Sequence, residues 1–451
     1  MDSTERAAPT GAGLRRVAIA SCVGTTIEYY DFFVYSTAAA LVFPKVFFPA
    51  LGSTAGMVAS FATYAVAFIA RPVGAMIFGH LGDRIGRKRT LISTLMLMGV
   101  STVLIGLIPG AATIGVAAPV LLVVLRFVQG LALGGEWAGA TLLTAEYAPP
   151  GQRGRYAMFP QLGPPIAIAL SSATFLVTDL TVGNQSFLDY GWRVPFLISI
   201  VLVGAGLYVR LKIEETPVFR AGQRQQPTAH TPLREAFTQA PREILLAAGS
   251  VTIMLALGLI TQTYLISYGL SPTGAALSRP LVLSLGIVAA VANTLTVILS
   301  AIYSDRFGRR ILIMLCCGGA AVWSLLLFPL LDTHSPVAFA VALIVTLSIQ
   351  GLGYGAVGAF LPETFPTRYR YTAAGMSYNL AGIVGGAIPP LAAAPLAAAF
   401  GTFSVGVLLC GLAVLSLWCT ATLTETKDRD LRQARPRGST ECTVVEAVVA
   451  R

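Results

Sequence analysis

The sequence is poor in charged residues and in residues that bind metals. Charged residues make up 12% of the chain, and there are only three His and six Cys residues. Typical soluble domains are about 25% charged, so the composition excludes an ordinary soluble domain. The His residues have no metal-ligand spacing, and five of the six Cys residues lie in apolar runs, where Cys is usually a small hydrophobic residue. The sequence therefore predicts no metal site and no disulfide framework.

Motifs of the common enzyme classes are also absent from the sequence. It contains no GxxxxGK[ST] loop for nucleotide phosphates, and no nucleophile has a convincing neighbouring base. Residues 1–14 are polar and lead into an apolar run too long for a cleaved signal peptide. We therefore expect neither an enzyme nor an ATP-driven pump, and no cofactor other than a proton that acts as a coupling ion.

Long apolar runs dominate the rest of the sequence. Hydrophobic residues make up 55% of the chain, and the mean hydropathy is +0.73. A spanning helix needs about 20 apolar residues. Runs of this kind fall at residues 17–43, 53–81, 90–110, 117–145, 155–179, 193–211, 244–268, 279–302, 311–331, 336–361, 371–397 and 401–423. The sequence predicts an all-α membrane protein with twelve transmembrane helices.

Basic residues fall mainly on one side of this predicted topology. The chain has 31 Lys and Arg residues and a net charge of +10. If both termini are cytoplasmic, all but five of these residues are on inner segments; the exceptions are Lys45, Arg193 and Arg279 outside and Arg71 and Arg126 within spans. This is the positive-inside pattern. It predicts a multi-pass protein of the cell (inner or plasma) membrane with both termini cytoplasmic, surrounded by lipid and without a nucleic-acid partner.

Two charged motifs occur once in each half of the sequence, always on the predicted inner face. The repeated acid–base pairs are Asp83/Arg87 with Asp305/Arg309, and Glu146/Arg153 with Glu363/Arg370. Snorkelling of long basic side chains to the membrane interface would explain the bases. It would not explain paired acids at repeated places, so we predict that these residues form a cytoplasmic gate.

The repeats also predict how the chain is divided. Residues 214–242 form the only long polar segment between apolar runs, and they contain four Pro residues, as is typical of a linker. We predict a polar N-terminus at 1–14, six-helix halves at 15–213 and 243–424, a cytoplasmic linker at 214–242 and a cytoplasmic tail at 425–451.

Several motifs resemble those of one transporter family. Residues 79–89 (GHLGDRIGRKR) resemble the signature loop between the second and third helices of the major facilitator superfamily, and residues 126–130 (RFVQG) resemble its fourth-helix motif. The narrower resemblance is to the metabolite:proton symporter family, and its motifs stand at residues 26–32, 71–75, 134–137, 159–163, 190–196, 214–217 and 361–366. Tyr29 departs from this pattern, since the family usually has Trp there.

This resemblance implies a fold, a mechanism and a range of solutes. The fold would be two pseudo-symmetric six-helix halves around one central site that opens alternately to each side. Family members carry shikimate, oxoglutarate, citrate, proline, betaine and aromatic acids. In the superfamily the first and fourth helices line the central cavity, which implicates Arg126 on the fourth helix as a group that binds a solute.

Five ionisable residues lie within the predicted spans, where a charge costs at least about 2.5–3.5 kcal/mol. Glu28 and Asp31 are three residues apart, so they share a helix face near mid-membrane. Two neighbouring carboxylates cannot both ionise cheaply in a low dielectric, and we predict that they carry the coupling proton. The alternative is that they neutralise Arg71 and Arg126. Glu136 lies nearer the inner face, as a proton relay or as the partner of another group.

The candidate solute contacts are two arginines and several neutral polar residues. An Arg can hold a carboxylate through two parallel hydrogen bonds, and we prefer Arg126 over Arg71, for which a structural role is the alternative. The neutral candidates are Tyr35, Gln161, Gln262 and Gln350, from a wider set that includes Asn293, Tyr354 and Tyr378. The alternative for each is an interhelical hydrogen bond.

These observations predict a secondary active transporter that moves a small polar metabolite together with protons. The solute would bear a carboxylate, as an organic acid, an amino acid or a betaine does. A proton-driven antiporter that exports a small organic molecule is the first alternative, and a non-transporting sensor on the same scaffold is the second. The predicted partners are the solute, protons and lipid, and we expect a functional monomer.

Overall fold

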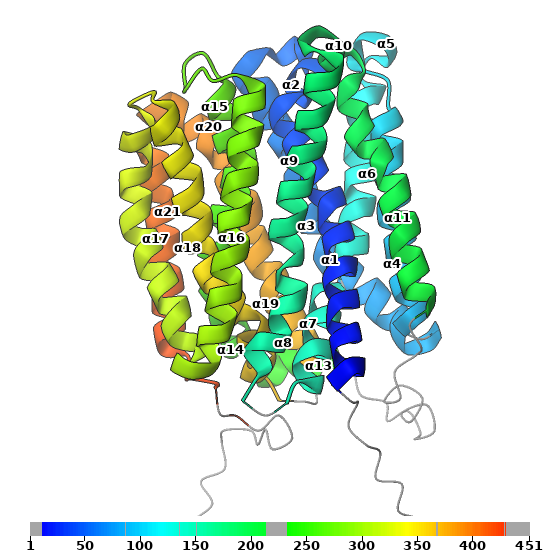
Figure 1. Ribbon diagram of the computed structural model, residues 1–451, viewed down its shortest axis with the longest axis vertical. Coiled ribbons are helices and arrows are strands. Elements are labelled where there is room, and N and C mark those ends of the chain that lie inside the picture. Colours follow the sequence, from blue (N-terminus) through cyan, green and yellow to red (C-terminus); the bar gives the residue numbers. More distant parts are fainter. Residues whose placement is uncertain are drawn as a thin grey trace, which may run out of the picture.

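The computed structural model describes residues 11–85, 87–134, 136–149, 151–212, 232–366, 369–427 and 429. All regular secondary structure in these residues is helical. Long helices run side by side along the long axis of the molecule, as Figure 1 shows. We use "inner end" for the lower end of the bundle in Figure 1, the end predicted to be cytoplasmic, and "outer end" for the opposite end.

Residues 11–212 form the first group of helices. Its crossings are α1 (Gly11–Leu41), α3 (Gly52–Ile85), α4 (Arg87–Leu107), α6 (Ala117–Leu133) followed by α7 (Glu136–Tyr147), α8 (Arg153–Gln161) followed by α9 (Gly163–Val182), and α11 (Val194–Lys212). Short helices cap its outer end, namely α2 (Phe43–Val46), η1 (Pro49–Leu51), α5 (Ala111–Ile114), α10 (Asn184–Asp189) and η2 (Gly191–Arg193).

Residues 232–422 form the second group. Its crossings are α14 (Pro241–Ile260) continued by η3 (Thr261–Leu265) and α15 (Ile266–Leu270), α16 (Arg279–Phe307), α17 (Arg309–Leu331), α18 (Pro336–Thr364), α19 (Arg370–Ala381) continued by η4 (Gly382–Ala387) and α20 (Ile388–Phe400), and α21 (Phe403–Thr422). A short helix, α13 (Pro232–Gln239), lies inside the segment predicted to be a linker.

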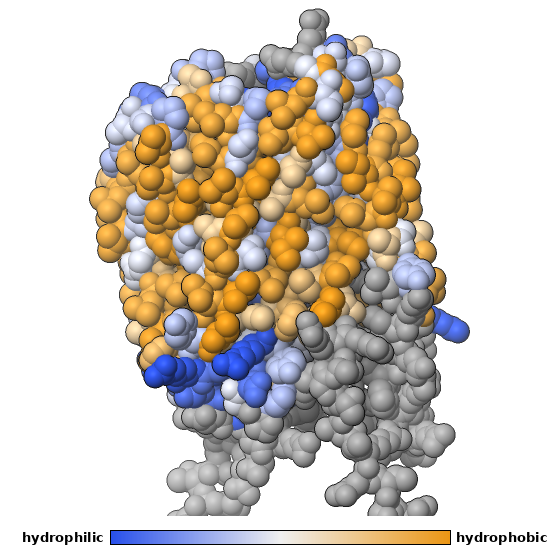
Figure 2. All heavy atoms as spheres, viewed as in Figure 1, coloured by the Kyte–Doolittle hydropathy of each residue, from blue (hydrophilic) through white to orange (hydrophobic). Residues whose placement is uncertain are grey.

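The predicted all-α membrane fold is confirmed. Among the described residues, ten helices are long and apolar enough to cross a membrane, and Ala117–Leu133 is a shorter apolar helix. The remaining predicted crossing is α1, which is 31 residues long but carries Glu28, Asp31 and three tyrosines that reduce its apolar character. Figure 2 shows the consequence at the surface, a broad apolar belt with hydrophilic residues toward both ends. Exposed residues such as Leu180 and Val201 belong to the apolar surface that lipid would cover.

Local chemistry explains where the helices turn or widen. The turn between α16 and α17 consists of Gly308, whose φ of 102° is easy only for glycine. The π-helical segment η4 ends just before Pro389 and Pro390, which have no N–H groups to bond to the preceding turn. Such π segments occur often at functional sites, and both η3 and η4 contact α14.

The two groups of helices meet along the middle of the molecule. Helices α1, α8 and α9 of the first group contact η3, α16 and α18 of the second, and α3 contacts η4 and α20. Several polar side chains within the spans lie on this interface, among them Tyr29, Gln161 and Tyr378. It is therefore the place to look for a binding site.

Candidate functional site

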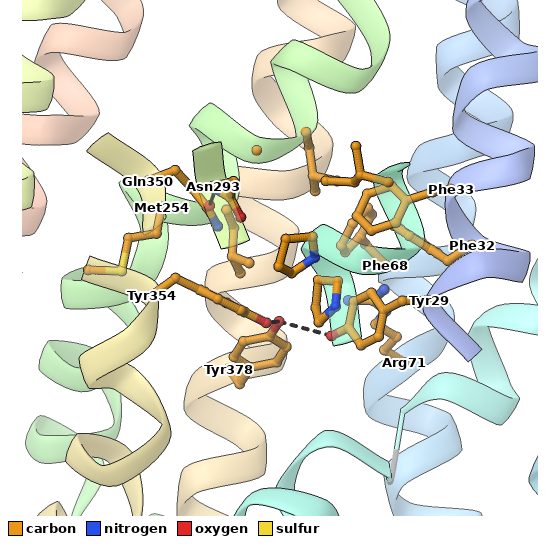
Figure 3. A pocket seen from close by; sticks show the side chains of 16 residues that line it. Tyr29, Phe32, Phe33, Phe68, Arg71, Met254, Asn293, Gln350, Tyr354 and Tyr378 are labelled. Atoms are coloured by element: carbon orange, nitrogen blue, oxygen red, sulfur yellow. Dashed lines mark hydrogen bonds between the residues drawn. The ribbon is translucent and has the colours of Figure 1, made fainter. Parts of the chain in front are cut away.

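A small cavity lies between the two groups of helices near the centre of the bundle (Figure 3). Its first-group wall comes from α1, α3 and α9, and its second-group wall comes from α14, α16, α18 and α19. The cavity volume is about 40 Å³, which is room for a few water molecules. The polar side chains in its walls are Tyr29, Arg71, Asn293, Gln350, Tyr354 and Tyr378.

Arg71 is the only charged side chain among the described residues that line this cavity. Its guanidinium lies over two aromatic rings, 4.8 Å from the centre of Phe32 and 4.3 Å from the centre of Phe68. Its Nε and Nη2 atoms make no hydrogen bond to the protein, and the ion pairs among the described residues do not involve it. A buried cation with open donors is a natural partner for an anion.

Close packing of α3 against α6 fixes the position of Arg71. A Cβ atom added to Gly134 would lie 2.0 Å from the carbonyl oxygen of Arg71, and one added to Gly74 would lie 1.9 Å from that of Leu131. Only glycine permits such an approach at these two positions. The motifs around residues 71–75 and 134–137 therefore place the guanidinium on the cavity wall.

Three tyrosines close the inner side of the cavity and join the two groups of helices. The hydroxyl of Tyr378 lies 3.0 Å from the hydroxyl of Tyr29 and 3.0 Å from that of Tyr354. Trp137 of α7 stacks on the Tyr378 ring at 4.0 Å, with the planes only 2° apart. Gln161 of α8 accepts a hydrogen bond from Trp137 Nε1 and donates one to the Tyr354 carbonyl. These contacts form a polar and aromatic floor below the cavity.

A pair of amides forms the part of the second-group wall opposite Arg71 (Figure 3). Asn293 donates hydrogen bonds from Nδ2 to the Leu347 carbonyl and to Gln350 Oε1. This uses both hydrogens of the Asn293 amide and the oxygen of the Gln350 amide. The Gln350 amino group and the Asn293 side-chain oxygen are left to serve a ligand, one as a donor and one as an acceptor.

Asp31 lies away from the cavity, in the interior of the first group of helices. Its side chain is fully buried; Oδ1 accepts a hydrogen bond from Ser199, and Oδ2 has no hydrogen-bond partner. Thr102 lies near the carboxyl group, and its hydroxyl donates to the Met98 carbonyl. Thr102 accepts from Gln129, which in turn accepts from Arg126 Nη1 at 2.9 Å. Hydrogen-bonded polar side chains therefore lie between Asp31 and Arg126.

Arg126 is also off the cavity wall, although the sequence favoured it as a solute contact. It is fully buried, with its guanidinium 4.7 Å from the ring centre of Phe32, 3.9 Å from that of Tyr35 and 4.7 Å from that of Tyr64. Its Nε and Nη2 atoms have no hydrogen-bond partner. The Phe32 ring consequently contacts both buried guanidinium groups.

Glu28 and Asp31 have different surroundings. Glu28 and Glu136 line a second small cavity together with Trp137 and Tyr29. Tyr29 belongs to the walls of both cavities. The structure thus brings Glu28 to Glu136, whereas Asp31, one turn further along α1, contacts Ser199 of α11.

The other predicted solute contacts are placed as follows. Gln350 lines the central cavity, whereas Gln161 supports its floor from α8. Tyr35 donates to Thr63 within the first group. The backbone carbonyl of Gln262, in η3, accepts a hydrogen bond from Ser36 across the interface at 3.2 Å.

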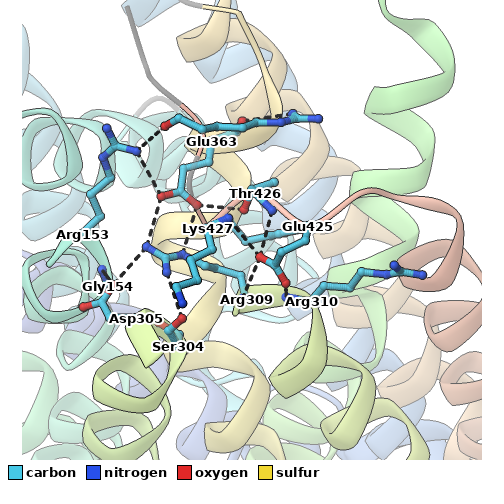
Figure 4. A network of polar contacts seen from close by, with 12 residues as sticks. Arg153, Gly154, Ser304, Asp305, Arg309, Arg310, Glu363, Glu425, Thr426 and Lys427 are labelled. Carbon is cyan, nitrogen blue, oxygen red and sulfur yellow. Dashed lines mark hydrogen bonds and ion pairs between the residues drawn. The ribbon is translucent and has the colours of Figure 1, made fainter. Parts of the chain in front are cut away.

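An ionic network joins the two groups at the inner end (Figure 4). Arg309 binds Asp305 at 3.0 Å and Glu363 at 3.1 Å, all within the second group. From the first group, Arg153 lies 3.6 Å from Glu363, and the backbone N–H of Gly154 donates to Asp305 at 2.8 Å. Arg370 donates to the nearby Phe365 carbonyl. The side chains of Asp83, Arg87 and Glu146 lie outside the described residues.

Residues 424–427, which follow α21, add to this network, and we call them the tail strap. Glu425 accepts hydrogen bonds from the backbone N–H groups of Arg309 and Arg310 at the start of α17, where a helix favours negative charge. Thr426 donates to Glu363 Oε2 at 2.8 Å. The tail strap therefore contacts the same carboxylate that Arg153 and Arg309 share (Figure 4).

An ion pair joins the two groups near the outer end. Arg279, at the start of α16, binds Asp179 of α9, and its guanidinium lies 4.2 Å from the Phe187 ring centre. We did not predict this pair from the sequence, where Arg279 counted only as one of the few outer basic residues. Polar contacts among the described residues thus join the two groups of helices at the outer end, at the floor of the central cavity and at the inner end.

Two groups of spanning helices around a central cavity with a buried cation in its wall define a membrane carrier. The sequence matches the Major Facilitator Superfamily over residues 22–390. The chain belongs to this family, and the family predicted from the sequence motifs is confirmed. Because the family and the relatives below are membrane transporters, the chain is a transporter and not an enzyme.

Curated relatives are similar over nearly the whole chain. The inner membrane metabolite transport protein YhjE of Escherichia coli (strain K12) is 42% identical over 419 residues, which cover 92% of this chain and 95% of the relative. The shikimate transporter of that organism is 37% identical, over 85% of this chain and 87% of the relative. The proline/betaine transporter of the same organism is 34% identical, over 94% of this chain and 86% of the relative.

Solved structures with the same fold are also found. The proton:xylose symporter XylE, bound to 6-bromo-6-deoxy-D-glucose, has a TM-score of 0.74 and 18% identity, covering 93% of this chain and 98% of that chain. A partially occluded inward open form of XylE from E. coli has a TM-score of 0.73, covering 93% and 100%. At 18% sequence identity, the similarity to these structures establishes the fold alone.

Proposed function

We propose that this transporter moves a small carboxylate-bearing metabolite together with protons by alternating access. The observation that carries the proposal is Arg71, a buried cation on the wall of the central cavity with two nitrogens that make no hydrogen bond to the protein. A solute carboxylate would supply the missing acceptors. The relatives named for shikimate and for proline and betaine support this choice, since all three solutes bear a carboxylate.

Asp31 is our proposed proton carrier. An ionised carboxylate that is buried and only partly hydrogen-bonded is costly, and a proton on Oδ2 would remove the charge. Thr102 lies near this carboxyl group and is hydrogen-bonded through Gln129 to Arg126, and the Phe32 ring contacts both Arg126 and Arg71, which supports a link between Asp31 and the cavity. Glu28 and Glu136, beside Tyr29, would pass the proton toward the inner end.

Alternating access would use the contacts at the two ends of the interface. Opening inward requires separation of Arg153 and Gly154 from Glu363 and Asp305, and opening outward requires separation of Asp179 from Arg279. We also propose that the two groups of helices are the moving halves, that both termini are cytoplasmic in the cell membrane, and that one chain is sufficient for transport. The inner position of the basic residues supports this orientation.

Uptake into proteoliposomes tests the proposal. The purified chain is reconstituted, an inward proton gradient is imposed, and labelled shikimate, proline, betaine and short hydroxy acids are offered singly. We expect one or more carboxylates to accumulate above the equilibrium level, and a protonophore to abolish the accumulation. Equal uptake with and without the gradient would contradict proton coupling. Efflux driven by the inward gradient would instead establish the antiporter.

A further inference from the structure

We infer that the central cavity selects a monocarboxylate whose remaining polar groups are neutral, and that Gln350 and Asn293 set this selection. A dicarboxylate or a zwitterion of the same size would bind poorly. The inference rests on the proposed function, in which Arg71 binds the solute carboxylate. It goes further because it specifies the charge of the solute and a second recognition surface.

The charge of the cavity wall is the first argument. Arg71 contributes one positive charge, and the described lining residues contribute no carboxylate. One solute carboxylate therefore balances the wall. A second carboxylate would enter a largely apolar cavity with no cation to receive it, and an unpaired buried charge is strongly unfavourable.

The opposite wall gives the second argument. Asn293 and Gln350 are neutral, and their mutual hydrogen bond holds both amides in place. They offer one donor and one acceptor, which suits a hydroxyl or carbonyl group of the solute. The amides belong to the second group of helices and Arg71 to the first, so a solute that meets both would connect the two walls of the cavity (Figure 3).

The aromatic rings give a third argument, against a solute with a cationic nitrogen. Such a group needs a carboxylate or the open face of an aromatic ring. Arg71 lies over the Phe68 ring, Arg71 and Arg126 both lie over the Phe32 ring, and Trp137 stacks on Tyr378. The rings nearest the guanidinium are thus already engaged, and Arg71 itself repels a second cation.

Competition within a matched chemical series tests the selection. Glycerate, serine and tartronate share a three-carbon skeleton but are a monocarboxylate, a zwitterion and a dicarboxylate. Quinate, pipecolate and cyclohexane-1,2-dicarboxylate repeat the comparison on a six-membered ring. We measure how each compound inhibits uptake of the best labelled carboxylate, and how each shifts the melting temperature of the purified protein. We expect the monocarboxylate in at least one series to be at least tenfold more potent than its two partners.

Two variants of one residue test the role of the amide wall. Gln350→Glu places a carboxylate opposite Arg71, so the potency of the zwitterion relative to that of the monocarboxylate should rise at least tenfold. Gln350→Met keeps the length of the side chain without adding a charge. It should weaken binding of the monocarboxylate without strengthening binding of the zwitterion. The thermal shift with each compound reports binding even where a variant no longer transports.

The outcomes distinguish this inference from the proposed function. If the dicarboxylate or the zwitterion matches the monocarboxylate in both series, or if Gln350→Glu leaves the order unchanged, the selection proposed here is wrong, whereas proton-driven carboxylate uptake stands. If no carboxylate accumulates under a proton gradient and none shifts the melting temperature, the proposed function itself is wrong.

Discussion

Phe32 contacts both buried guanidinium groups of the first group of helices. Its ring centre lies 4.8 Å from Arg71 and 4.7 Å from Arg126. Cations on an aromatic face are stabilised by about 0.5–2 kcal/mol, so the ring lets two like charges occupy one apolar interior. Of the two, only Arg71 reaches the cavity.

The first prediction concerns Arg71. Arg71→Lys should lower uptake of a carboxylate at least tenfold, because an ammonium group cannot reproduce the planar fork of donors or the stacking on Phe32 and Phe68. The measurement is initial uptake in proteoliposomes, with protein orientation and amount matched. Arg306→Lys is the control, since Arg306 is exposed at the inner end. Unimpaired carboxylate uptake by Arg71→Lys would remove Arg71 from the binding site.

The second prediction concerns Asp31. Asp31→Asn keeps the acceptor for Ser199 and removes the site of protonation. Accumulation driven by a proton gradient should disappear, while exchange of labelled for unlabelled solute at equal pH should persist. Ser199→Ala is the control, because it removes the hydrogen bond and leaves the carboxyl group. The assignment fails if Asp31→Asn still concentrates solute as the wild type does.

At the scale of single residues, the sequence indicated the candidate site residues better than it indicated their surroundings. Arg71, Arg126, Glu28 and Asp31 stand out because charge is rare in a span. Which of them faces the cavity depends on how each helix is rotated about its axis. Helices that are apolar on nearly all sides carry little amphipathic pattern to reveal that rotation. For the same reason the neutral wall residues could only be proposed as members of a wider set.

Among the elements, α9 and α16 meet at the outer end of the interface. Asp179 and Arg279 join them by one ion pair, and both side chains are largely buried. Removal of one partner would leave the other charge without its counterion, which is more costly than loss of an exposed pair. The contact should therefore hold the outer side closed.

The third prediction tests this ion pair. Asp179→Asn and Arg279→Gln should each raise the labelling rate of a cysteine placed at Ile168 in the central cavity wall, when the reagent is added from outside. The double reversal Asp179→Arg with Arg279→Asp should restore slow labelling. Asp189→Asn, an exposed acid near the same end, is the control. Labelling that stays at the control rate in both single variants would show that the pair does not govern outer access.

Most of the elements could be predicted from the sequence, because a run of about 20 apolar residues has few alternatives in a bilayer. The run predicted at 371–397, for example, corresponds to α19, η4 and α20. The contacts between elements far apart in the chain could not be predicted from the sequence. The repeated acids and bases indicated an inner network, but nothing in the spacing of residues 424–427 connects them with Glu363. That contact depends on where α18 and α21 end in space.

Polar contacts at three levels of one interface stand out among those that join the two groups of helices. These are the network around Glu363 at the inner end, the tyrosine hydroxyls in the middle, and the Asp179–Arg279 pair at the outer end. A carrier that closes both ends around its centre is occluded. The relative strength of the three levels would then set how much of the protein faces each side.

The fourth prediction concerns the middle level. Tyr378→Phe keeps the stacking on Trp137 and loses the hydrogen bonds to Tyr29 and Tyr354. The bond to Tyr29 is the one of the two that crosses the interface, and its loss costs the closed form about 0.5–1.5 kcal/mol, so the inward-open population should rise several-fold. Spin labels at the inner ends of α8 and α18 would report longer distances. Tyr303→Phe, an exposed tyrosine on α16, is the control. Distance distributions identical to the wild type would mean that these hydroxyls do not stabilise closure.

The tail strap has a consequence for how the protein is made. Arg153 and Asp305 are translated long before Glu425 and Thr426, which follow α21. Domains generally fold as they emerge from the ribosome, so both sets of helices can pack while the inner network still lacks its final partners. A nascent carrier would thus complete its inner seal only after the twelve predicted crossings have been inserted.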